Sequence, residues 1–197
     1  CGVGFDAFVS LKFADSGKRG LLTYLENTLH ESLTYQPETY EIENEEGTVR
    51  HKAFLIACGN ASQYGNNAYI TPHASLTDGL MDITIMEPFT VLDVPSLSFQ
   101  LFNKTLDQNS RIKTMRAKKI KIHRQHDGVM HFDGDPLMAG KELEVEIIPA
   151  GLHVIASPKK RTKEESENLL QVISNYFSGL HLKGEEMLAK RQSHLFE

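Results

Sequence analysis

The stretch from residue 57 to residue 82 reads ACGNASQYGNNAYITPHASLTDGLMD. It leaves an apolar run over residues 53–57, crosses a loop of small and amide residues, and reaches Thr77-Asp78-Gly79 just before a new alternating run. This order predicts a strand, a long loop, a tight turn and a second strand. Long loops inside compact domains must satisfy their own backbone polar groups and are uncommon without a function. On local features alone, an ordinary β connection that ends in an Asp-Gly turn also explains the stretch.

Size and composition describe a globular chain. It has 197 residues, which predicts one domain, or one domain plus an appendage. With 40% hydrophobic and 24% charged residues, its composition is typical of a soluble globular protein. The net charge of −5 argues against nucleic-acid binding. Without an apolar run of about 18 residues or a signal segment, we expect a cytoplasmic protein. Cys1 and Cys58 lack the spacing of a disulfide framework or zinc site, and Cys58 is expected to be a buried thiol.

The chain starts abruptly. It has no initial Met, and residues 2–9 (GVGFDAFV) place apolar side chains at every second position, which predicts a strand. A chain that begins inside a strand is expected to be part of something larger.

Helical spacing of apolar residues predicts several helices. Thr90 and Asp93 resemble a capping box at the start of one of them, where Pro95 is tolerated only in the first turn. The expected helices cover residues 18–33, 90–103, 164–177 and 184–191. The last two of these form a C-terminal helical extension.

Alternation predicts a largely antiparallel β structure in the middle and late parts of the chain. A four-residue turn at 44–47 is expected to join the first two strands, and a turn at 125–128 to join two later ones. The fold class is therefore mainly β with α lids (β-rich α+β). The expected strands cover residues 39–44, 48–58, 81–86, 117–123, 129–132, 141–147 and 151–156.

Two acidic turns are the candidates for chemistry. The first is Asp78-Gly79-Leu80-Met81-Asp82, and the second is Phe132-Asp133-Gly134-Asp135-Pro136. Carboxylates one residue apart on a turn can both face a cleft, where one accepts a proton or helps to hold a metal ion. Either segment is equally compatible with a plain turn, because Asp and Gly are favoured there by local hydrogen bonds and positive φ.

Five blocks in one order resemble the C-terminal half of the diacylglycerol kinase-like lipid kinases, a family that includes the bacterial YegS-type kinases and the sphingosine kinases. The resemblance runs from about Gly2 to Pro158, and its specificity lies in the order of the blocks. They are residues 4–7 (GFDA), 58–65 (CGNASQYG), 72–82 (Pro72, Ala74, Asp78-Gly79-Leu80 and Asp82), 133–137 (DGDPL) and 148–152 (IPAGL).

The resemblance implies a two-domain kinase. In this family a nucleotide-binding α/β domain with a Gly-Gly-Asp-Gly-Thr motif precedes an antiparallel β-sandwich of the lipid kinase/NAD kinase-like fold, and the active site lies between them. Residues 1–158 match the second domain, followed by a helical extension at 159–197. Because no Gly-Gly-Asp-Gly-Thr occurs in the chain, we expect the N-terminal domain to be absent and the fragment alone to bind ATP poorly and to be inactive.

The resemblance also assigns roles to both acidic turns. It implies a Mg²⁺ held by the Asp78 carboxylate and the main-chain oxygens of Ser75 and Leu80, which are ligands that a hard cation prefers. Asp135 matches the position of a Glu that acts as general base toward the lipid hydroxyl. Its side chain is one methylene shorter, which leaves open whether Asp135, Asp133 or a bridging water reaches the hydroxyl. Phosphoryl transfer mainly needs positioning and charge neutralisation.

Other features have two interpretations each. His123, His126 and His131 are expected to be exposed around a hairpin. Phe8, Phe89, Phe99 and Phe102 are lipid-pocket lining or plain core. The locally basic segments are solvated edge-strand faces or a surface for anionic lipid head groups; they contain Arg111, Lys113, Arg116, Lys118, Lys119, Lys121, Lys159, Lys160 and Arg161.

The sequence therefore predicts the C-terminal domain of an ATP- and Mg²⁺-dependent lipid kinase that acts on a diacylglycerol-like or sphingoid lipid. The expected partners are the lipid substrate, an anionic membrane surface in transient contact, and the absent nucleotide-binding domain. A sheet surface left uncovered by that domain would favour a homodimer. The rival hypothesis is a non-catalytic β domain that binds a lipid or a protein, and the NAD kinases are a closer enzymatic alternative.

Overall fold

A computed structural model describes residues 1–16, 35–65 and 67–155, and Cys1–His153 form one compact unit. Several expectations fall outside the described residues: the helices at 18–33, 164–177 and 184–191, the domain boundary at 158, and the basic residues at 159–161. No helix in the described part is long and apolar enough to cross a membrane.

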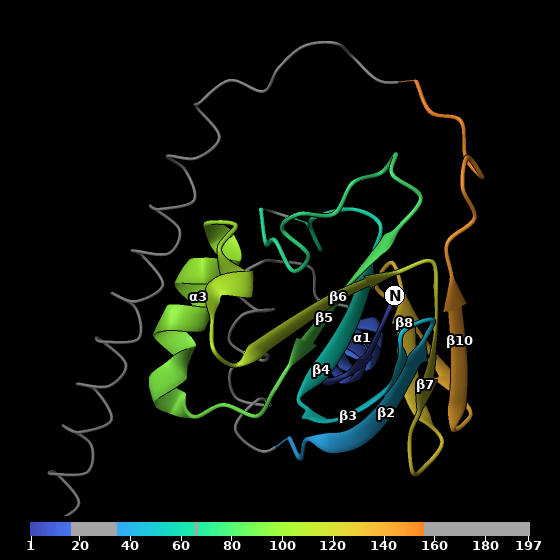
Figure 1. The fold of residues 1–197 in the computed structure, drawn as a ribbon. Coiled ribbons are helices and arrows are strands. Elements are labelled where there is room, and N and C mark those ends of the chain that lie inside the picture. The colour runs from blue at the N-terminus through green and yellow to red at the C-terminus, as the bar shows by residue number, and fades with distance from the viewer. Residues whose placement is uncertain (17–34, 66, 156–197) are drawn as a thin grey trace, which may run out of the picture. The chain divides into compact units, whose positions relative to one another are not determined.

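The larger of two antiparallel sheets has six strands (Figure 1). The short strand β1 lies in its interior, between β4 and β8. In spatial order the strands are β6 (Ile112–Ala117), β5 (Met81–Met86), β4 (Leu55–Gly59), β1 (Gly2–Gly4), β8 (Gly128–Phe132) and β9 (Asp135–Ala139).

The second sheet has four strands and packs on the first. Its order is β10 (Glu142–Glu146), β7 (Lys119–His123), β2 (Glu38–Asn44) and β3 (Gly47–Ala53). One buried cluster contains side chains from both sheets, including Ile42 and Ile122 from the second and Ile56 and Ile83 from the first. The prediction of a mainly β, antiparallel sandwich is confirmed.

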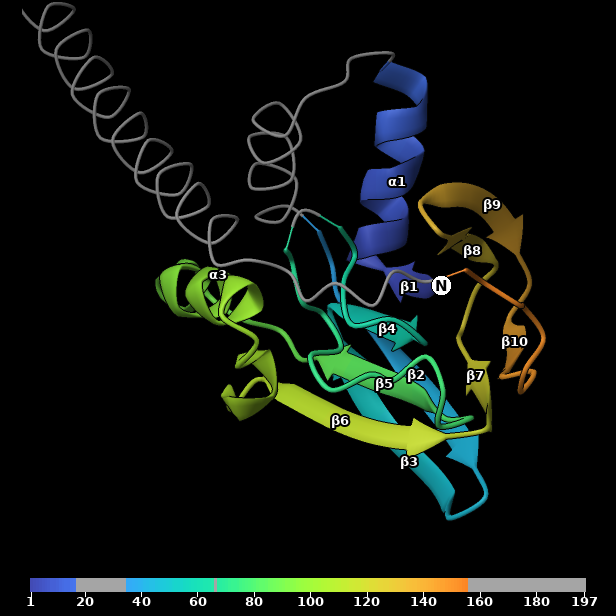
Figure 2. The ribbon, with the colours of Figure 1, turned by 90° about the horizontal axis from the view of Figure 1, so that it is seen from above.

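Helices cover the other face of the six-stranded sheet (Figure 2). The helix α1 (Phe5–Ser16) places Phe5 and Val9 in a second buried cluster, together with Leu97 of α3 (Val94–Phe102). Strand β4 is buried on both faces because Leu55 and Ala57 contact this cluster while Ile56 and Cys58 contact the one between the sheets. That double burial explains why β4 is an unbroken apolar run.

The N-terminal strand ends much earlier than expected. We predicted a strand over residues 2–9, but β1 ends at Gly4 and α1 begins at Phe5. Gly4 has φ 94°, and a Cβ there would lie 2.6 Å from the Phe54 carbonyl oxygen, so only glycine fits the turn. A short apolar run fits both periodicities, since Phe5 and Val9 are also one helical turn apart.

Three more predictions for the β structure differ from the structure. Residues 48–58 form β3 and β4, separated at Phe54, whose N–H donates to the Met86 carbonyl at 2.7 Å. The predicted hairpin between 117–123 and 129–132 is wrong, because β7 pairs with β2 and β10 whereas β8 pairs with β1 and β9. Residues 151–155 form no strand, contrary to prediction.

The helix predicted at 90–103 is confirmed as the short 3₁₀ segment η1 (Val91–Asp93) followed by α3, and a second 3₁₀ turn, η2 (Leu106–Gln108), lies after it. The Asp93 carboxylate accepts the Thr90 N–H at 2.8 Å, and Pro95 lies in the first turn of α3. Strand β10 also has the predicted alternation, with Leu143 buried and its three glutamates exposed.

Candidate active site at one end of the six-stranded sheet

Both acidic turns lie at the same end of the larger sheet. The register pairs Asp82 at the start of β5 with Gly59 at the end of β4, and Gly2 at the start of β1 with His131 near the end of β8. Because neighbouring strands are about 4.8 Å apart, β5 and β8 are separated by about 14 Å across β4 and β1. Parts of three of the five blocks, 58–65, 72–82 and 133–137, therefore lie at one end of the sheet.

The second acidic turn is a two-residue hairpin connection between β8 and β9. Phe132 pairs with Asp135, and the two residues between them have positive φ, 48° at Asp133 and 93° at Gly134, as in a type I′ turn. The predicted Asp-Gly turn is thus confirmed. Both carboxylates are exposed, and neither has a hydrogen bond or ion pair among the described residues.

A polar network centred on the buried side chain of His131 lies directly beside this turn. His131 is 6% exposed, and its Nε2 lies 3.1 Å from Asp6 Oδ2. The same Asp6 oxygen accepts the Tyr64 hydroxyl at 2.8 Å, while Asp6 Oδ1 accepts the Ala7 N–H at 2.8 Å. On the other side of the ring, the Gly134 N–H points to His131 Nδ1 at 3.4 Å. The network joins three of the five blocks, through Asp6, Tyr64 and Gly134.

His131 was expected to be an exposed hairpin residue, and this expectation is wrong. Its burial depends on Asp6, which is 125 positions away in the sequence. Gly2 makes the contact feasible, because a Cβ there would lie 2.7 Å from His131 Nε2 and would also collide with the Asp6 carboxylate. Of the three histidines, His126 is exposed as expected and His123 is half-buried.

The opposite end of the same hairpin is held by Arg124, which sequence reasoning did not single out. Arg124 is 7% exposed and donates to four carbonyl oxygens at 2.7–3.1 Å. A guanidinium has five N–H donors in a fixed plane, so it can bind two strand ends at once. The hairpin is thereby fixed at both ends. The four acceptors are Gly128, Val129, Ala139 and Gly140.

The first acidic turn is closed by an arginine. Asp78 Oδ1 accepts the Leu80 N–H at 3.0 Å, and Asp78 Oδ2 contacts the Arg116 guanidinium, whose Nε also lies 3.3 Å from Asp82 Oδ2. The Leu80 N–H and the Arg116 guanidinium hold the pKa of Asp78 below its usual value. Arg116 in turn has a raised pKa, chiefly because of the Asp82 carboxylate. Arg116, one of the basic residues expected on a solvated edge-strand face, is therefore paired with two carboxylates.

The oxygen atoms of this turn are ligands that suit a hard cation. Gly79 has φ 71°, and the guanidinium on Asp78 and Asp82 shows that a positive charge is stabilised here. The part of the chain that the structure describes has no group of three His, Cys, Asp or Glu side chains that could hold a metal. A Mg²⁺ would therefore need the main-chain oxygens predicted at Ser75 and Leu80, and would meet Arg116 as a competitor for Asp78. The metal site remains a prediction.

The fifth block lies close to this turn. A Cβ built on Gly79 would be 3.8 Å from the Pro149 ring. Residues 148–152 thus pass beside the Asp78 turn.

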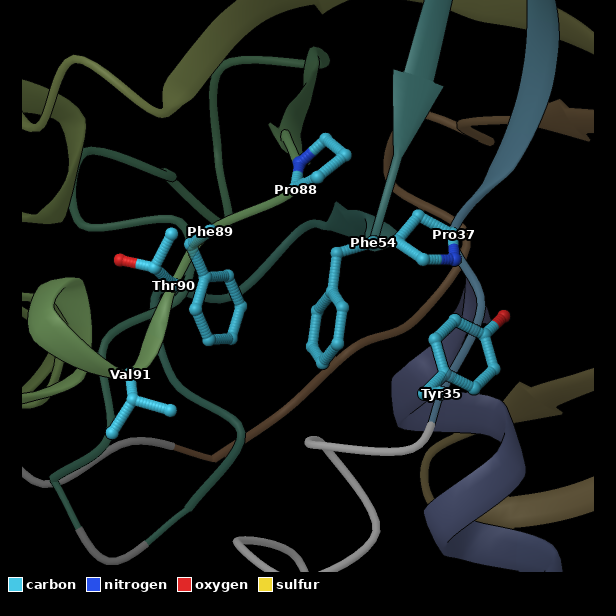
Figure 3. A pocket seen from close by; sticks show the side chains of 7 residues that line it. All are labelled: Tyr35, Pro37, Phe54, Pro88, Phe89, Thr90 and Val91. Atoms are coloured by element: carbon cyan, nitrogen blue, oxygen red, sulfur yellow. The ribbon is translucent and has the colours of Figure 1, made fainter.

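An apolar hollow lies near the opposite end of β4, next to the residue before that strand. Its volume is about 380 Å³. The Phe54 and Phe89 rings form its floor with centroids 4.6 Å apart (Figure 3). Of the four predicted lipid-lining phenylalanines, only Phe89 lines it, and Phe99 is 61% exposed. The full lining is Tyr35, Pro37, Phe54, Pro88, Phe89, Thr90 and Val91.

Ion pairs also connect the strands β7 and β10. Lys119 Nζ lies 2.6 Å from Glu144 and 3.8 Å from Glu146, which lowers the pKa of Glu144. On β6, Arg111 lies 3.6 Å from Asp93. Lys113, Lys118 and Lys121 are exposed. Some of the described basic side chains, Arg111, Arg116 and Lys119, therefore form ion pairs with carboxylates. Contact with a lipid surface stays a prediction.

Curated proteins that resemble this chain in sequence are named as lipid kinases. Lipid kinase YegS of Escherichia coli (strain K12) is 30% identical over 139 residues, which cover 71% of this chain and 45% of the relative. The "Probable lipid kinase YegS" of Salmonella arizonae is 27% identical over 157 residues, covering 79% of this chain and 51% of the relative. The chain thus spans about half the length of the curated relatives it matches.

Solved structures show the same fold. A Bacillus anthracis str. Sterne protein assigned as a diacylglycerol kinase matches with a TM-score of 0.52 and 18% identity, over 75% of this chain and 49% of that one. A family model described as the YegS C-terminal NAD kinase beta sandwich-like domain matches residues 1–156. This chain therefore belongs to the family of YegS-type C-terminal domains.

Proposed function

We propose that this chain supplies the lipid-acceptor half of an ATP- and Mg²⁺-dependent lipid kinase, which phosphorylates a hydroxyl of a diacylglycerol-like or sphingoid lipid. The observation that carries the proposal is the Asp133-Gly134-Asp135 turn, which sits on a hairpin fixed at both ends. Its carboxylates are exposed and have no hydrogen bond or ion pair within the described part of the chain. The relatives named lipid kinases support the reaction class.

Asp135, or Asp133 in its place, accepts the proton of the lipid hydroxyl. As that O–H bond breaks, the oxygen forms a bond to the γ-phosphorus of ATP, and the bond from that phosphorus to the β–γ bridging oxygen breaks to release ADP. Bound Mg²⁺ would neutralise charge on the phosphates. General-base help of this kind contributes about 10²–10⁴-fold to a rate.

The nucleotide is expected to bind mainly to a part that this chain does not contain. The chain spans about half of its relatives, and no Gly-Gly-Asp-Gly-Thr motif occurs in it. We therefore propose that residues 1–197 alone do not transfer phosphate. A cytoplasmic location with transient contact to an anionic membrane surface completes the proposal, because the acceptor resides in a membrane.

The test measures transfer of labelled phosphate from ATP to diacylglycerol or a sphingoid base in mixed micelles. It uses the intact protein, by which we mean this chain together with the proposed nucleotide-binding domain. Asp135→Asn and Asp133→Asn are compared separately, and we expect the variant that removes the base to lose about 100-fold or more in kcat. Asp127→Asn, at an exposed position before β8, is the matched control. Wild-type rates in both turn variants would exclude a carboxylate base. Lipid binding without any transfer would favour the non-catalytic binding domain.

A further inference from the structure

We infer that His131 is a positioning residue that holds the Asp133-Gly134-Asp135 turn through the main-chain N–H of Gly134 and is itself held by Asp6 and Tyr64. The link to catalysis rests on the proposed function, whereas the positioning of the turn does not.

The hydrogen bonds define the state of the imidazole. A backbone N–H can only donate, so His131 Nδ1 must be the acceptor for Gly134. The ring proton then lies on Nε2 and is donated to Asp6 Oδ2 at 3.1 Å. A neutral imidazole with a proton on Nε2 is thus the form that connects the carboxylate to the turn.

Two side chains at the centre of the network are largely buried. Those of His131 and Asp6 are 7% and 10% exposed, and the hydroxyl of Tyr64, a residue that is 46% exposed, adds a second donor to the same carboxylate oxygen. Breaking a buried polar network is costly, because the groups left behind lose partners that water cannot replace. The orientation of the ring is therefore strongly determined.

His131 acts on the turn through the backbone and not through the Asp135 side chain. In the β8–β9 register, Phe132 opposes Asp135 and His131 opposes Pro136. Successive side chains of a strand point to opposite faces, so His131 and Asp135 lie on different faces of the sheet. His131 thus contacts the turn itself and not the Asp135 carboxylate.

Two substitutions separate this role from plain core packing. His131→Asn keeps an acceptor oxygen at the δ position, where it can receive the Gly134 N–H, whereas His131→Leu removes both hydrogen bonds. His126→Asn, at an exposed histidine on the connection before β8, is the matched control.

The first measurement is amide hydrogen exchange in the intact protein, followed on peptides that cover residues 131–136. We expect exchange in the turn to rise about tenfold in His131→Leu, as loss of one hydrogen bond allows, and to return toward the wild-type rate in His131→Asn. If His131→Leu does not fold, Tyr64→Phe removes only the hydroxyl donated to Asp6 and should raise exchange by a smaller factor. Wild-type exchange in the turn of a folded His131→Leu variant, or in Tyr64→Phe where that variant replaces it, would overturn the inference.

The second measurement is kinetic. We expect kcat for lipid phosphorylation to fall about 10- to 100-fold in His131→Leu, because small displacements of a catalytic group are costly, with the KM for ATP unchanged and kcat largely recovered in His131→Asn. Equal loss of kcat in the Asn and Leu variants would overturn the positioning role. If the wild type transfers no phosphate to lipids, the proposed function fails, and the exchange data alone decide the inference about His131.

Discussion

The Arg116 guanidinium bridges the carboxylates of Asp78 and Asp82, so the turn that the sequence marks as a Mg²⁺ site already holds a positive charge. Arg116 Nε lies 3.3 Å from Asp82 Oδ2, and Arg116 is about half-exposed. An arginine on a flexible side chain can leave a carboxylate when a stronger cation arrives. Metal and guanidinium are therefore expected to be alternative partners of Asp78.

Arg116→Ala should bind Mg²⁺ at the Asp78 turn more tightly than the wild type. An exposed ion pair is a weak competitor, so the half-maximal Mg²⁺ concentration should fall by no more than about fivefold. The measurement is Tm against MgCl₂ without nucleotide. Arg111→Ala is the control, because Arg111 is similarly exposed and pairs with Asp93. If the rise in Tm with MgCl₂ is lost in Arg116→Ala, or persists in Asp78→Asn, then Mg²⁺ and Arg116 do not compete for Asp78.

Acid should destabilise the fold partly through Asp78 and Asp93. Leu80 N–H and Arg116 lower the pKa of Asp78, and the N–H and hydroxyl of Thr90 lower that of Asp93. A lowered folded-state pKa gives stability that is complete above the unfolded value of about 3.9 and is lost as the pH falls through the folded value. Urea unfolding between pH 6 and pH 3 should show a smaller decline in Asp93→Asn than in the wild type. An identical decline would exclude a contribution from Asp93.

The Cys58 thiol should be unreactive in the folded protein. Burial raises its pKa to about 12, and the thiolate is the reactive form. At pH 8, iodoacetamide should label Cys58 at least about 100-fold more slowly in the native state than in urea, as followed by mass spectrometry of the peptide. Native labelling at the rate of a free thiol would show that β4 opens readily.

Arg124→Lys should destabilise the protein by about 2–4 kcal/mol. Lysine keeps the charge but cannot reach all four carbonyl oxygens, and hydrogen bonds of charged groups contribute about 1.5–3 kcal/mol each. The free energy of unfolding in urea is the measurement. Arg50→Lys, at an exposed position on β3, should change it little. A comparable loss in both variants would mean that the buried contacts of Arg124 are not the cause.

The sequence was most informative where structure depends on neighbours in the chain. The turn at Asp133-Gly134 was predictable because two residues with positive φ favour Asp-Gly. Alternation identified β10, and the pair Thr90 and Asp93 identified the start of the helical segment that contains α3. Each of these features is decided within a few residues.

Features decided by distant partners were missed. The helix α1 begins at Phe5 because the Phe5 N–H donates to the Phe54 carbonyl at 2.9 Å, which alternation cannot reveal. Phe54 itself lies inside the apolar run 53–57, which contains no turn residue to mark where β3 ends and β4 begins. At the candidate site, Asp6 was part of a recognised block, but nothing local marked His131 as its partner. The passage between sheets and the buried network both depend on tertiary contacts.

The position of β1 has a consequence for the order of folding. Val3 pairs with Ile56 on one side and Met130 on the other, so the middle of the six-stranded sheet is filled by residues remote from both neighbours in the chain. The β4–β5 and β8–β9 pairs are closer in sequence and have less loop entropy to overcome. Pulse-labelled hydrogen exchange should therefore find β1 amides protected after those of β8 and β9. The end of the sheet that carries both acidic turns is then completed last, so a protein trapped before that step would keep its hairpins and lack its site.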